Sequence, residues 1–176
     1  MPDTPKHRAA LGGRGPVGGS AIRLEVLPEG CLLHVMGETD AAEIERLLGA
    51  IGAGGASVRK AGFQQWFIAG DQPLPPTAVA ELAALLRPKA YVSDQGHGRV
   101  RIGVSGSGAR DLLAKGTAVD LDAGVFPEGA AAMTLFGHVS VQLARTGPDR
   151  FELTVLRSFS ESLWEELEHL AKAYQG

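Results

Sequence analysis

Hydrophobic and polar residues alternate along residues 22–26, which is the period of a half-buried strand. A turn signal at residues 28–30 separates this segment from a second apolar run at residues 31–36. The period then changes to that of a helix, with apolar residues three and four positions apart. This helix is predicted to begin at Asp40, which forms a capping box with Glu43 and precedes an apolar stripe of Ile44, Leu47, Leu48 and Ile51.

The first half of the chain continues with two short strands and a second helix. Strands are predicted at residues 57–61 and 65–69, on either side of Gly62. A loop with three prolines follows, and Thr77 is the predicted N-cap of a helix that Pro88 stops.

The second half of the chain repeats this succession of strands and helices. Strands are predicted at residues 91–93 and 100–105, and Ser107 is the predicted N-cap of a short helix. The last helix is predicted to begin at Ser158, which forms a capping box with Glu161. Three further strands are predicted between these helices, at residues 133–136, 139–143 and 151–156.

Apart from one additional strand between the helices of the second half, we interpret the chain as the order ββαββα twice, which indicates an internal duplication. We expect a flexible N-terminal tail at residues 1–20, a first α+β repeat at residues 21–89 and a second at residues 90–176. The tail is rich in glycine and proline and cannot by itself bury enough surface to offset its ordering entropy. Because each predicted helix has one apolar face, we predict an α+β fold with helices packed on mainly antiparallel sheets.

Composition and charge exclude several classes of protein. The 176 residues carry 17 Lys+Arg against 20 Asp+Glu, and this net charge of −3 argues against a general nucleic-acid binder. The single cysteine, Cys31, excludes an internal disulfide and a cysteine-based metal site within the chain. No apolar run approaches the roughly 18 residues that span a bilayer. No signal peptide is evident, so we expect a cytoplasmic protein.

No catalytic or metal-binding motif is complete. The residues around Ser105 depart from the G-x-S-x-G elbow, and residues 106–108 lack the lysine that completes a phosphate-binding loop. The five histidines have no metal-ligand spacing. We therefore predict no catalytic, cofactor-binding or metal-binding residues and interpret the chain as a binding or assembly unit.

An ordered series of motifs runs through residues 100–170. It comprises Val104-Ser105-Gly106, Ala109-Arg110-Asp111-Leu112-Leu113-Ala114-Lys115-Gly116, Asp120-Leu121, Phe126-Pro127-x-Gly129, Thr134, Phe151-Glu152-Leu153-x-Val155, Arg157-Ser158-Phe159 and Leu163-Trp164-x-x-Leu167. In this series the chain resembles the gamma subunit of heterotetrameric sarcosine oxidase. The first half matches that family more loosely, at residues 27–37 and 66–70.

The resemblance implies a duplicated α+β fold similar to the folate-binding domain of glycine-cleavage aminomethyltransferases. It implies an accessory, non-catalytic subunit that stabilises the alpha subunit of a flavin-dependent complex oxidising sarcosine or related N-methyl or secondary amino acids. FAD, FMN, NAD and tetrahydrofolate are then expected on the larger alpha and beta subunits, with no cofactor on this chain alone and no nucleic-acid or membrane partner. Thr117 stands where many gamma subunits have a cysteine, so a thiol role at that position is absent.

Aromatic side chains are the predicted anchors for the partner subunits, because large aromatic residues are enriched at protein interfaces. The four candidates are Trp66, Phe67, Phe159 and Trp164. Two alternatives stay open on the sequence alone: a stand-alone folate-binding protein and an interaction domain of unrelated function.

Overall fold

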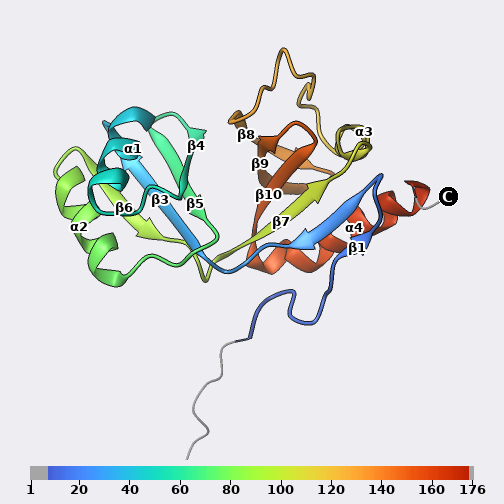
Figure 1. Cartoon of the computed structure of the whole chain (residues 1–176), viewed down its shortest axis with the longest axis horizontal. Helices are drawn as coiled ribbons and strands as arrows, with labels where there is room; N and C mark the ends of the chain where they lie inside the picture. Colours follow the sequence, from blue (N-terminus) through green and yellow to red (C-terminus); the bar gives the residue numbers. More distant parts are fainter. Residues whose placement is uncertain (1–7, 175–176) are drawn as a thin grey trace, which may run out of the picture.

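The computed structural model describes residues 8–174 and contains two antiparallel sheets, each covered by helices on one face (Figure 1). The predicted α+β class with mainly antiparallel sheets is confirmed. No helix among the described residues is long and apolar enough to cross a membrane.

The first sheet has four strands in the order β4-β5-β3-β6. Its apolar side chains pack against α1 and α2 and form one core, which includes Val35, Ile44 and Leu82. The elements of this unit are β3 (Cys31–Gly37), α1 (Ala41–Ala50), β4 (Ser57–Gly62), β5 (Gln65–Gly70), α2 (Pro76–Leu86) and β6 (Ala90–Asp94).

The second sheet has six strands in the order β1-β2-β7-β10-β9-β8. Its core is the larger one and includes Ile102, Leu153 and Trp164. The elements are β1 (Val17–Gly18), β2 (Arg23–Val26), β7 (Arg99–Ser105), α3 (Ala109–Leu113), β8 (Ala131–Phe136), β9 (Val139–Gly147), β10 (Arg150–Leu156), η1 (Arg157–Phe159), α4 (Ser160–Ala171) and η2 (Lys172–Tyr174).

Strand β2 comes before the first unit in sequence but pairs within the sheet of the second unit. The first unit is built from consecutive elements of the chain, β3-α1-β4-β5-α2-β6, and its last strand, β6, pairs with its first, β3. In the second sheet the corresponding place beside β7 is taken by β2. Leu24 of β2 is fully buried in the core of the second unit, and this burial holds the strand there. Residues 21–26 therefore precede the first repeat in sequence but complete the second sheet, and the division between residues 89 and 90 stays a prediction about the sequence repeat.

The predicted helix starts are only partly correct. The cap at Asp40 is confirmed, because its Oδ1 accepts a 2.8 Å hydrogen bond from the Glu43 N–H. The other three helices begin without a side-chain cap, at N-cap residues Pro75, Gly108 and Phe159, so the caps predicted at Thr77, Ser107 and Ser158 are wrong. In α2 a proline occupies the first turn, where its missing N–H needs no partner. Before α4 the chain first forms the η1 turn, so the N-cap is Phe159, one residue later than the predicted Ser158.

The described part of the N-terminal segment lies against the second unit. Leu11 is 4% exposed within the second core, and Val17 packs against the same core. Arg14 lies beside α4, with its Nη1 3.4 Å from an oxygen of Glu168. Residues 8–20 have too few apolar side chains to form a core of their own, and they are ordered because these side chains pack against the core of the second unit. The first seven residues of the predicted tail lie outside the described residues.

Candidate functional site

The helix-free faces of the two sheets meet through polar side chains. Arg59 on β4 of the first sheet reaches Glu152 on β10 of the second, and Gln142 on β9 donates a 2.9 Å hydrogen bond to the backbone oxygen of Lys60. Apolar contacts are few on this face and centre on Phe67, which packs with Leu32 and Ala69. Ion pairs and hydrogen bonds therefore carry much of the contact between the two units.

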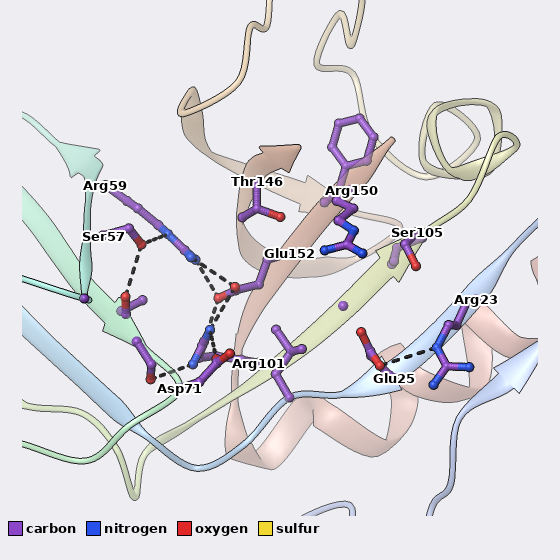
Figure 2. A pocket seen from close by; sticks show the side chains of 17 residues that line it. Arg23, Glu25, Ser57, Arg59, Asp71, Arg101, Ser105, Thr146, Arg150 and Glu152 are labelled. Carbon is purple, nitrogen blue, oxygen red and sulfur yellow. Dashed lines mark hydrogen bonds and ion pairs between the residues drawn. The ribbon is translucent and has the colours of Figure 1, made fainter. Parts of the chain in front are cut away.

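Glu152 is the centre of this polar contact (Figure 2). Arg59 donates to both carboxylate oxygens, at 2.5 and 3.0 Å, and Arg101 donates to the same two oxygens at 2.7 and 3.0 Å. Arg101 also donates to the backbone oxygen of Gly70 and to Asp71, at 2.8 and 2.9 Å. The side chains of Arg59, Arg101 and Glu152 are 7%, 8% and 4% exposed, so all three charges are withdrawn from water.

Opposite charges keep Glu152 and Arg101 ionised in spite of their burial. Burial acts to raise the pKa of Glu152, but hydrogen bonds and charge from Arg101 and Arg59 outweigh it and leave the pKa below its ordinary value. Burial likewise acts to lower the pKa of Arg101, and Glu152 and Asp71 outweigh it and raise the pKa. Neither group is tuned toward neutral pH, which suits a structural ion pair better than proton transfer.

Lowering the pH is expected to remove the stabilisation that Glu152 contributes. Because its folded pKa lies below the ordinary value of 4.5, the contribution is complete above that value and is lost as the pH falls through the folded pKa. Urea unfolding of the wild-type chain and of Glu152→Gln would measure this over the acidic range. The difference in unfolding free energy should be constant near neutrality and shrink in acid, and a difference independent of pH would contradict the prediction.

An open cleft of about 500 Å³ extends from this network between the two sheets (Figure 2). Ser57, Gly70 and Asp71 line it from the first sheet and the loop that follows. The second sheet contributes a floor of strands β2, β7 and β10, on which Gly103 lies between Glu25 and Glu152. Gly103 has no side chain of its own, and the side chains of Glu25 and Leu27 lie over it, 3.1 and 3.2 Å from where a Cβ would stand.

The structure separates the four predicted partner anchors. Trp164 is fully buried in the larger core, and Phe67 is 2% exposed between the sheets with the Arg99 guanidinium carbon 4.9 Å from its ring centre. Both side chains are occupied by contacts within the chain. Trp66 is half-buried beside the smaller core, and Phe159 is 49% exposed before α4. Of the four residues, only Trp66 and Phe159 have exposed side-chain surface that a partner subunit could contact.

The single thiol is not a reactive group. Cys31 is 5% exposed, and burial, followed by the charge of Asp94, raises its pKa to about 11. The thiol is therefore protonated at neutral pH, as expected for a small buried side chain. Among residues 8–174 no three His, Cys, Asp or Glu side chains gather as a metal site.

Sequence reasoning missed the residues of the ion network. Arg101 and Glu152 occupy strand positions between buried apolar neighbours, so the alternating pattern assigns them to the opposite, solvent-facing side. Only the packing of a second sheet on that side makes it an interior. The available signal was a charged residue between two apolar neighbours in each of these strands, which indicates a covered face but does not identify the element that covers it.

Solved structures share this fold. A chain of the heterotetrameric sarcosine oxidase from Corynebacterium sp. U-96 superposes with a TM-score of 0.83 at 19% identity, covering 97% of this chain and 97% of that one. The regulatory subunit of aspartate kinase from Thermus thermophilus gives 0.54 at 12% identity, over 89% of this chain and 99% of that one. Glycine cleavage system aminomethyltransferase T from Bartonella henselae gives 0.52 at 17% identity, over 90% of this chain and 47% of that chain. The structure thus places the chain in a class of paired α+β units that recurs in proteins with different functions.

The sequence narrows this class to one family. The model of the sarcosine oxidase gamma subunit family matches residues 82–173, just over half of the 176 residues. The chain belongs to the sarcosine oxidase gamma subunit family, which confirms the resemblance found in its motifs. No curated protein matches the chain by sequence.

Proposed function

We propose that this chain is the accessory gamma subunit of a heterotetrameric, flavin-dependent complex that oxidises sarcosine or a related secondary amino acid. In this role it is non-catalytic and stabilises the alpha subunit by adding buried surface. The observation that carries the proposal is the family match over residues 82–173, joined to a fold similarity that covers 97% of both chains. The two alternatives named from the sequence have no comparable support.

The partner subunits carry the cofactors in this proposal. FAD, FMN, NAD and tetrahydrofolate are bound by the larger alpha and beta subunits, and the complex works in the cytoplasm. The charged groups between the sheets support a non-catalytic role for this chain. Glu152 and its two arginines stabilise each other and do not provide a proton donor or acceptor near neutral pH.

Exposed apolar side chains supply a surface for the alpha subunit. Phe159 is 49% exposed and Leu156, three residues earlier, is 40% exposed. A second group lies where β4 runs beside β8: Phe63, at the tip of the β4–β5 hairpin, is 86% exposed, and Met133 and Leu135 on β8 are 42% and 56% exposed. Apolar groups of this kind support an interface, since burying them in a complex removes them from water.

Affinity purification tests the proposal. The tagged full-length chain, expressed in its native host, should co-elute with larger flavin-containing subunits and with sarcosine-oxidising activity. Phe159→Ser should reduce the recovered flavoprotein, whereas the control Leu85→Ser, which alters a 51% exposed leucine on α2, should not. Elution of the chain as a lone stable monomer without any flavoprotein would contradict the proposed role.

A further inference from the structure

One positive charge in the cleft has no counter-charge. Arg23 lies 3.5 Å from Glu25, and the two buried arginines are neutralised by Glu152 and Asp71. Arg150 also lines the cleft, and within residues 8–174 its side chain makes no hydrogen bond or ion pair. Figure 2 shows its guanidinium pointing into the space between Glu152 and Ser105. The cleft therefore contains one exposed, uncommitted cation.

Two hydroxyl groups line the cleft near this cation. Ser105 on β7 is the direct cross-strand partner of Arg150 on β10. Thr146 on β9 is the extra residue of a β-bulge, because Arg150 pairs with Gly147 and Phe151 pairs with Arg145. Neither hydroxyl makes a hydrogen bond to any residue in the described part of the chain. A bulge that turns a side chain toward a cleft is a common feature of binding sites.

We propose that this end of the cleft binds a small monocarboxylate, through the guanidinium of Arg150 and the hydroxyls of Ser105 and Thr146. A guanidinium pairs with a planar carboxylate through two parallel hydrogen bonds, and each hydroxyl adds a further donor. The cleft volume of about 500 Å³ falls within the range of small-molecule sites. The carboxylates of Glu25 and Asp71 line the same space and repel a second negative charge, so the site selects a monoanion over a polyanion.

The inference concerns the isolated chain and does not depend on the proposed subunit role. Titration of the ¹⁵N-labelled full-length chain with sodium lactate, at constant ionic strength, would detect binding by amide shifts. We expect saturable shifts at Ser105, Thr146 and Gly147. The uncharged isostere lactamide should give no saturable shift, and inorganic phosphate should bind more weakly than lactate.

A matched pair of variants locates the site. Arg150→Gln should weaken lactate binding roughly tenfold or more, because a charged hydrogen-bond partner is lost. Arg46→Gln removes an exposed arginine from α1 and should leave the affinity unchanged. Equal shifts with lactate and lactamide, absence of saturable shifts, or equal binding by both variants would each overturn the proposal. An unchanged spectrum elsewhere and an unchanged Tm for Arg150→Gln would exclude misfolding as the cause of lost binding.

Discussion

Replacing Glu152 by alanine is expected to lower the free energy of unfolding by about 3–5 kcal/mol, the loss typical of breaking a buried ion pair by removing one partner. The variant leaves the guanidinium of Arg59, 7% exposed, without a counter-charge at the contact between the two sheets. Arg101 keeps its bond to Asp71 but loses both bonds to the buried carboxylate. Urea unfolding of the full-length chain, followed by circular dichroism, measures the loss.

A second carboxylate in the same cleft provides the control. Glu25 lies on the other side of Gly103, its side chain is 38% exposed, and it lies 3.5 Å from Arg23. Because an exposed ion pair contributes little, Glu25→Ala should cost no more than about 1 kcal/mol. Equal effects of the two substitutions would show that the buried network does not hold the sheets together. Replacing Arg59, Arg101 and Glu152 together by apolar residues of similar size should recover much of the stability lost in Glu152→Ala.

Replacing Trp164 by alanine is expected to destabilise the chain by about 3–5 kcal/mol, since a large side chain is removed from a closed core. Trp164 is fully buried on α4 and packs within the core that joins this helix to the second sheet. Its Nε1 has no hydrogen-bond partner among the described residues, so Trp164→Phe, which keeps an aromatic ring, should cost less than the alanine variant. Thermal and urea unfolding of the three proteins would rank them.

A substitution of the exposed Phe159 provides the comparison with the buried Trp164. It precedes the same helix and is 49% exposed, so Phe159→Ala should change the stability of the isolated chain by no more than about 0.5 kcal/mol. Under the proposed function it should nevertheless weaken association with the alpha subunit. A large loss of stability in Phe159→Ala, or none in Trp164→Ala, would reverse the assignment of the two aromatic residues.

The strands were predictable because their pattern is local. The alternation in residues 100–105 gives the positions of β7 that face the core under the helices, and the spacing of Leu163 and Leu167 gives the buried face of α4. The starts of the helices were less predictable. Several residues near a helix start can serve as caps, and the choice between Thr77 and Pro75 at α2 depends on the path of the preceding loop.

The candidate site could not be predicted at all. Arg59 and Glu152 are 93 residues apart, and nothing local to either one shows that they meet. Trp164 and Phe159 likewise have the same large aromatic character in sequence, although one is fully buried and the other half exposed. Burial of an individual side chain depends on which element packs above it, and that element lies elsewhere in the chain.

The amino-acid sequence by itself determined the α+β class, the duplicated order of strands and helices, and the motifs of the gamma subunit family, because each follows from neighbouring residues. The tertiary structure alone decided that β2 completes the second sheet and that Arg59, Arg101 and Glu152 form a buried network. It also decided that Arg150 is left without a counter-charge in the cleft. The reason is physical: strand pairing and ion pairing join residues that are distant in sequence, and their energies depend on burial, which exists only after the two sheets have packed together.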